Sequence, residues 1–200
     1  NLVDTENSDQ KDINIIIEEK PTGEIMAGAG YGTDGSSFSI AVKENNFRGE
    51  GINLNTKLSL SEQTVKGFFE YTHPNFAYSD RALSTSLESS VTDKLTDFGY
   101  KSSLNKVSLG TRYEQFEDTF FSPSLSIASE NLETTSSASA AYQKQEGSYF
   151  DTNFDYTLTY DKRNSVYQPS SGFYSIWYQQ LPVISENQTI INGYTITGYK

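Results

Sequence analysis

The sequence predicts an all-β fold, an antiparallel meander of about ten amphipathic strands that is a candidate for a membrane-spanning β-barrel. Several segments alternate strictly between apolar and polar residues; in 153–160, for example, Phe154 and Leu158 alternate with Asp155 and Thr157. A strand with this period of two has one apolar and one polar face. The connections have hairpin length, which predicts antiparallel pairing of consecutive strands. Many segments reach the roughly 9–11 residues that a tilted membrane strand needs.

The elements follow one another in a simple order. A polar start without periodicity leads into a strand at 12–20, which Pro21 and Gly23 close. The candidate strands of the meander are 24–32, 37–45, 52–61, 64–72, 81–92, 98–113, 120–131, 149–160, 172–181 and 189–199. A loop is expected at 93–97, and no segment has a helical period. In 98–113 the apolar parity changes between Leu104 and Val107, which predicts a β-bulge or a misplaced boundary. In 172–181 the pattern leaves open whether Trp177 or Ile176 lies on the apolar face.

Composition excludes several classes of function. The 200-residue chain has a net charge of −11, which argues against nucleic-acid binding because phosphate contacts need a Lys/Arg surface. The absence of cysteine excludes disulfides and thiolate metal sites. The 14 tyrosines and 12 phenylalanines suit a lipid–water boundary. Aromatic residues are also favoured in a soluble β-sandwich, which therefore remains the alternative.

The sequence shows no recognisable catalytic or cofactor motif. The single histidine, His73, precedes Pro74 in a connection, where a turn residue is far more common than a catalytic base. The glycine-rich segment 28–32 lacks the Lys-Ser/Thr pair and the helix that complete a phosphate-binding loop. We therefore predict a protein that is not an enzyme and that uses no cofactor or metal. The final residues, 195–200, have the pattern of a strand interior, which predicts a piece of a longer protein.

Four sequence blocks in a fixed order carry a family resemblance. The first is EEKPTG at 18–23, which leads into the glycine-rich segment AGAGY at 27–31. The others are ENNFRGEG at 44–51, YTHPNF at 71–76, and DKRN at 161–164 with PSSG at 169–172. Together they resemble the polypeptide-transport-associated outer-membrane barrel family over nearly the whole chain. His73 departs from the family pattern, which usually has Asp before this proline.

The resemblance implies a domain organisation. Residues 1–22 would be the C-terminal end of a periplasmic POTRA domain, including its last strand, and 23–200 the N-terminal portion of a barrel in the bacterial outer membrane. The N-terminal residues would lie in the periplasm. The periplasmic turns would carry the family's motif residues, which are Asn46, Phe47, Gly49, Gly51, Pro74, Asp161, Arg163, Pro169 and Gly172.

The resemblance also implies a function, the assembly and insertion of β-barrel proteins into the outer membrane. The partners would be unfolded outer-membrane proteins as substrates, accessory outer-membrane lipoproteins and the lipid bilayer. Two alternatives stay open: a related translocation barrel for one dedicated secreted partner, and a passive pore.

The first barrel strand is the expected site of substrate pairing. Glycine weakens a strand because it loses more entropy on folding and offers no side chain to pack. A weak edge of this kind could pair with an incoming strand through its backbone, by β-augmentation. The alternative is that the glycines only relieve crowding where a barrel curves. We call the residues expected to pair with the substrate strand the lateral gate; they are Ile25, Ala27, Gly28, Ala29, Gly30 and Tyr31.

Overall fold

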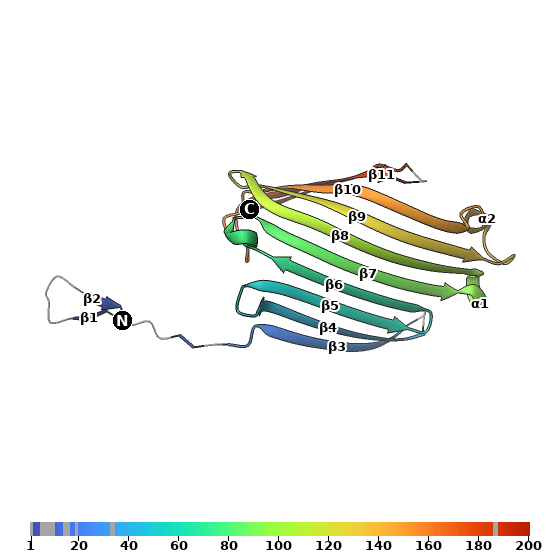
Figure 1. The fold of residues 1–200 in the computed structure, drawn as a ribbon, viewed down its shortest axis with the longest axis horizontal. Helices are drawn as coiled ribbons and strands as arrows, with labels where there is room; N and C mark the ends of the chain where they lie inside the picture. The colour runs from blue at the N-terminus through green and yellow to red at the C-terminus, as the bar shows by residue number, and fades with distance from the viewer. Residues whose placement is uncertain (1, 5–10, 14–16, 19, 33–34, 186–187) are drawn as a thin grey trace.

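The fold is a single antiparallel meander (Figure 1). The computed structural model describes residues 2–4, 11–13, 17–18, 20–32, 35–185 and 188–200, with side chains from Ile17 onward. Ten strands form one sheet in which each strand pairs with its neighbours in the sequence, from β3 at one edge to β12 at the other. The strands are β3 (Gly23–Gly32), β4 (Gly35–Phe47), β5 (Ile52–Ser61), β6 (Thr64–His73), β7 (Ala82–Lys94), β8 (Tyr100–Phe116), β9 (Thr119–Thr134), β10 (Gly147–Asp161), β11 (Gly172–Ile184) and β12 (Ile191–Tyr199). The predicted all-β meander is confirmed.

Short helices lie in three connections, η1 (Phe76–Tyr78), α1 (Leu95–Phe98) and α2 (Ala140–Gln143). The expected loop at 93–97 is wrong, because β7 continues to Lys94 and α1 follows it. Phe98, expected to begin a strand, instead ends α1. The reason is Gly99, which caps the helix in the left-handed region at φ 73° and turns the chain into β8.

The expected irregularity between Leu104 and Val107 is also wrong. Leu104 pairs with Ser90 and Glu130 in an unbroken ladder that continues through Val107. Leu104 is an apolar residue on the polar face of a regular strand, and this explains the change of parity. The register shift between β8 and β9 lies instead at 114–116, next to the turn.

A small hairpin precedes the sheet. It consists of β1 (Leu2–Asp4) and β2 (Lys11–Ile13), which pair antiparallel. Of the strand expected at 12–20, only the start lies in β2, and residues 17, 18 and 20 are not in a strand. Positions 14–16 and 19 lie outside the described residues. Ile17 is 79% exposed, so a strand at this point would have no packed neighbour among the described residues.

The register separates an apolar from a polar face. One continuous cross-strand row is apolar except at one threonine: Leu54, Tyr71, Thr85, Leu109, Leu125, Phe154 and Leu181. The next row, one residue along each strand, is mostly polar: Asn55, Glu70, Ser86, Ser108, Ser126, Asn153 and Pro182. Trp177 shares the face of Leu158, its partner, and Ile176 lies on the opposite face, which resolves the ambiguity left by the sequence.

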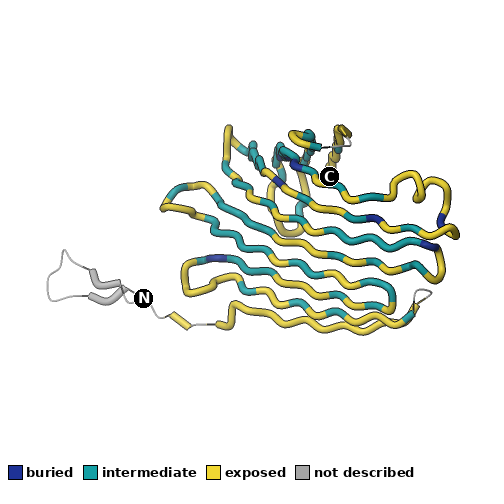
Figure 2. Tube along the Cα trace, turned by 45° about the vertical axis from the view of Figure 1, so that its right-hand side comes forward, coloured by how far each residue is buried: buried dark blue, intermediate teal, exposed yellow. Residues whose placement is uncertain are grey.

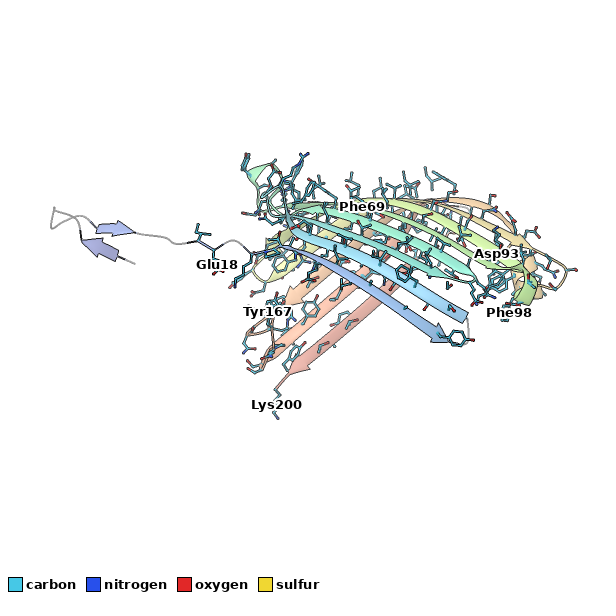
Figure 3. The ribbon with its side chains drawn as sticks, turned by 90° about the horizontal axis from the view of Figure 1, so that it is seen from below. Glu18, Phe69, Asp93, Phe98, Tyr167 and Lys200 are labelled. Carbon is cyan, nitrogen blue, oxygen red and sulfur yellow. The ribbon has the colours of Figure 1, made fainter. Side chains whose placement is uncertain are left out.

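The polar face is the concave one. A hollow of about 270 Å³ is lined by Glu70 of β6 and Tyr178 of β11, so the sheet curls around its polar face until distant strands approach each other (Figure 3). Asp155 is only 7% exposed and accepts hydrogen bonds from the Ser126 hydroxyl at 2.9 Å and the Tyr178 hydroxyl at 3.1 Å. Apolar side chains such as Leu109, 55% exposed, lie on the outside. This is the reverse of a soluble core, where apolar residues are buried.

The apolar side chains form a belt that steps along the strands. The cross-strand row that starts at Val42 on β4 passes through Leu87 on β7 and reaches Ile184 on β11. At the end of the sheet that carries the β4–β5 and β10–β11 connections, however, the last apolar residue of this face is Phe47 on β4, in the same cross-strand row as Leu83 on β7, whereas on β11 it is Phe173, which lies beyond that row. Barrel strands are tilted, so a belt of constant height must shift along successive strands. The apolar surface therefore has the geometry of a barrel belt.

Candidate functional site

Strand β3 carries all the residues expected to form a lateral gate. All ten residues of β3 are exposed, as Figure 2 shows along the lowest strand of the sheet. One side of β3 pairs with β4 from Gly23–Glu44 to Gly32–Gly35. Within the described part of the chain, no strand pairs with the other side. The structure thus places the expected residues on one of the two edge strands of the ten-stranded sheet, with β12 at the other edge.

The ladder shows which backbone groups of β3 are open. The Asn45 N–H donates to the Thr22 carbonyl at 3.2 Å, one residue before the pair Gly23–Glu44. In an antiparallel ladder, hydrogen-bonded and non-hydrogen-bonded pairs alternate. Even-numbered residues of β3 therefore bond to β4. The N–H and C=O groups of the odd-numbered residues point toward the open edge: Ile25, Ala27, Ala29 and Tyr31.

Side chains contribute little to the pairing of β3 with β4. Gly28 and Gly30 lie opposite Ser39 and Ser37 on the concave face. A hollow of about 570 Å³ lies against these four residues. A Cβ at Gly30 would lie 3.2 Å from the Ser37 hydroxyl oxygen, so even the small partner residues lie close to the glycine backbone. The sequence analysis missed the two serines, although small residues at every second position, opposite the glycines of β3, could have indicated them.

The outer face of β3 is apolar and uncovered. Ile25 is 77% and Tyr31 87% exposed, and Ala27 and Ala29 lie between them on the same face. These are the residues whose backbone groups point to the open edge. A strand added here would meet free backbone donors and acceptors beside an apolar surface.

The first motif turn joins β4 to β5. The Asn46 carbonyl accepts from the Gly49 N–H at 2.9 Å, and the Asn46 side-chain oxygen accepts from the Gly51 N–H at 2.7 Å. Both glycines have positive φ, 74° and 68°, a region that favours glycine. The Arg48 guanidinium lies 5.5 Å from the centre of the Phe47 ring. The motif residues therefore shape this turn.

The motif at 161–172 forms a second rigid connection. Arg163 donates two hydrogen bonds to Asp161, Nε to Oδ1 at 2.8 Å and Nη2 to Oδ2 at 2.6 Å, and it lies 4.4 Å from the Tyr174 ring centre. The hydrogen-bonded Asp161 carboxylate raises the pKa of Arg163, so this pair stays charged. Gly172 has φ 96°, and a Cβ there would lie 2.0 Å from the Lys162 carbonyl oxygen. Tyr174 is a partner that the sequence analysis missed.

The motif residues gather at one end of the sheet. Lys162 forms an ion pair with Asp118, so the β10–β11 connection is tied to the β8–β9 turn. Pro74 begins the β6–β7 connection, which the Phe76 N–H closes by donating to the Arg81 carbonyl at 2.9 Å. Pro169 lies in the β10–β11 connection. The turn end defined by these connections is also the end at which β3 begins.

The described residues show no group that suggests catalysis. His73 packs edge-on against Phe76, with ring centres 5.9 Å apart. Over the described ranges, no three His, Asp or Glu side chains are close enough to hold a metal ion. No described helix has the length and hydropathy needed to cross a bilayer.

Comparison with known proteins agrees with the sequence motifs. The Omp85 superfamily domain matches residues 46–195. Over 78 residues the chain is 32% identical to outer membrane protein assembly factor BamA of Buchnera aphidicola, a match that covers 38% of this chain and 13% of that protein. The crystal structure of BamA from Haemophilus ducreyi lacking POTRA domains 1–3 has the same fold, with a TM-score of 0.70 and 20% identity. This likeness covers 90% of this chain and 38% of that one.

The chain thus spans well under half of either relative, and its ten strands correspond to part of a BamA barrel. The family match runs from the end of β4 into β12 and so includes two of the four motif blocks in full and most of a third, 44–51. It covers three quarters of the sequence, 150 of 200 residues. The chain belongs to the Omp85 superfamily.

Proposed function

We propose that this chain forms part of an outer-membrane barrel that assembles and inserts β-barrel proteins, and that β3 pairs with the incoming strand. The observation that carries the proposal is the weak side-chain pairing of β3, whose glycines face only small serines on β4 while four residues direct their backbone donors and acceptors away from β4. The similarity to two BamA proteins supports the choice of activity. Unfolded outer-membrane proteins are the proposed substrates, and accessory lipoproteins the proposed partners.

The proposed mechanism is β-augmentation at a weak seam. An incoming strand would form backbone hydrogen bonds with Ile25, Ala27, Ala29 and Tyr31. Each such bond contributes only about 0.5–1.5 kcal/mol net, so a pairing of this length forms and releases without a cofactor. The glycines on the opposite face keep side-chain contacts few, which favours release.

The proposed domain organisation follows the family resemblance. Residues 1–22 would end a periplasmic POTRA domain, and 23–200 would form the N-terminal portion of the barrel. The turn end of the sheet would then lie in the periplasm, together with the N-terminal residues. The opposite end, with α1 and α2, would lie outside the cell.

Cysteine cross-linking tests the pairing step. In the intact protein, a cysteine at Ala27 is expected to form a disulfide with cysteines along one strand of a stalled substrate, because the Ala27 backbone lies at the open edge. Ile40 is the matched control, since it is the cross-strand partner of Ala27 on the same face but lies on an interior strand. Equal yields at positions 27 and 40, or no yield at 25, 27, 29 and 31, would contradict the mechanism and favour the passive pore.

Surface labelling tests the topology. Ser136 lies in the connection between β9 and β10, and Val166, 65% exposed, lies in the connection between β10 and β11 at the opposite end. With single cysteines in the intact protein, an impermeant maleimide added to whole cells is expected to label position 136 and to label position 166 only after the outer membrane is permeabilised. The reverse pattern would invert the proposed orientation.

A further inference from the structure

Two arginines at the turn end stack on aromatic rings on opposite faces of the sheet. The Arg81 guanidinium carbon lies 5.0 Å from the centre of the Tyr113 ring, and that of Arg112 lies 4.5 Å from the Phe120 ring. The cross-strand pair Ala82–Arg112 places Arg112 on the concave polar face. Arg81 precedes Ala82 and Tyr113 follows Arg112, so both lie on the outer, apolar face.

Arg81 lies directly at the edge of the apolar belt. The next residue of this face on β7 is Leu83, the last apolar residue of the belt on that strand. Beside Arg81, a line of aromatic rings crosses β8 to β11 on the outer face, with centres 5.6–6.0 Å apart: Tyr113, Phe121, Tyr156 and Trp177. Aromatic girdles of this kind mark the lipid–water boundary of membrane barrels.

The backbone holds Arg81 firmly in this position. Its carbonyl accepts from the Phe76 N–H at 2.9 Å, and its N–H donates to the Ser79 hydroxyl at 3.3 Å. Ser79 in turn donates to the Phe76 carbonyl at 2.6 Å. These bonds close the connection between β6 and β7 into a compact loop with Arg81 at its base.

The guanidinium of Arg81 lacks the carboxylate partner that Arg163 has. Arg163 makes a bidentate pair with Asp161. Among the described residues, no ion pair joins Arg81 to an Asp or Glu. Its contact with Tyr113 orients the planar group, while the N–H donors at its rim stay available at the edge of the belt.

We propose that Arg81, oriented by Tyr113, binds the phosphate group of a phospholipid in the leaflet at the turn end. A guanidinium binds phosphate through paired hydrogen bonds, and the apolar belt beside it accommodates the acyl chains. The apolar surface next to the cation selects a lipid phosphate over free phosphate. This inference rests on the membrane location in the proposed function and adds a specific ligand at a position that takes no part in strand pairing.

Lipid titration tests the site. Phosphatidylglycerol is titrated into the intact, detergent-purified protein, and the bound lipid is counted by native mass spectrometry. Arg81→Gln is expected to weaken binding about fivefold, the effect of one basic residue at an anionic surface. Arg112→Gln is the matched control, because it removes a neighbouring ring-stacked arginine from the other face, and it is expected to bind like wild type. Arg81→Lys keeps the charge but loses the paired N–H donors of the guanidinium. Its affinity for the lipid is expected to lie between those of Arg81→Gln and wild type.

Three outcomes would overturn the inference: equal binding by Arg81→Gln and wild type, an equal loss in Arg112→Gln, or displacement of the lipid by an equimolar concentration of inorganic phosphate. Insertion into phosphatidylglycerol vesicles, followed by protease protection, separates this inference from the proposed function. Failure of the wild-type protein to insert would refute the membrane location itself. If all variants insert normally but lipid binding does not depend on Arg81, the lipid site alone is refuted.

Discussion

Proline at both Ala27 and Ala29 is expected to slow the assembly of outer-membrane proteins about tenfold or more. Both N–H groups point away from β4, so the double substitution removes two donors from the open edge and leaves the ladder with β4 complete. Proline is tolerated on an edge strand whose N–H faces outward. Loss of two backbone hydrogen bonds at about 0.5–1.5 kcal/mol each corresponds to roughly a tenfold effect. The rate of substrate folding in proteoliposomes measures it.

The period of two in this ladder supplies matched controls. Valine at the same two positions keeps both donors and should assemble substrate at close to the wild-type rate. Proline at Gly28 and Gly30 removes donors to β4 instead, so we expect the barrel itself to lose its folded, heat-modifiable form on gels. If Ala27→Pro/Ala29→Pro assembled substrate normally in a folded barrel, the open edge of β3 would not be the pairing site.

Gly172→Ala is expected to cause the largest loss of stability of any single alanine substitution at a glycine of this chain. The new Cβ would lie 2.0 Å from the Lys162 carbonyl oxygen, an impossible separation, and the residue would have to keep φ 96°. The backbone conformation alone costs a non-glycine residue roughly 1–2 kcal/mol, and relief of the clash requires the connection between β10 and β11 to move. We therefore expect a total above about 3 kcal/mol. Urea unfolding of the barrel in micelles measures it.

Gly198→Ala is the control for this effect. Gly198 lies in β12, its φ is not in the left-handed region, and a Cβ there would meet no atom within 4 Å. Its substitution should change the unfolding free energy by less than about 0.5 kcal/mol, as for an exposed surface site. A similar urea midpoint for Gly172→Ala and Gly198→Ala would show that the connection between β10 and β11 adjusts at little cost. Gly172 would then not fix the conformation of that connection.

The burial pattern explains why composition alone does not reveal this fold. Ser126, fully buried, and Asp155 lie on the concave face, whereas Leu109 and Val65 are about half exposed on the outside. Only 35% of the residues are hydrophobic, too few for an obvious core, yet they suffice for one face of ten strands. The step of the apolar belt along the strands distinguishes this arrangement from a soluble sandwich.

The sequence by itself determined the strands and the turns. Strand β5 begins and ends where the alternation places it, and the bounds of the other nine strands of the large sheet differ from the predicted ones by at most three residues. The turn at Asn46, Gly49 and Gly51 could be predicted because its hydrogen bonds and positive φ values involve only residues close together in the sequence. Local conformation and a period of two depend only on neighbouring residues, so both can be predicted from the sequence.

The tertiary structure alone decided how these strands combine. Leu104 lies on the polar face, and Trp177 rather than Ile176 on the apolar face, because each must follow the register of its neighbours. The outward direction of the Ala29 N–H depends on which pairs with β4 are hydrogen-bonded. A period of two assigns side chains to faces, but the direction of each backbone group is fixed only when a strand meets its partner. The placement of Arg81 and Tyr113 together at the belt edge has the same origin, since pairing of β7 with β8 brings them into contact.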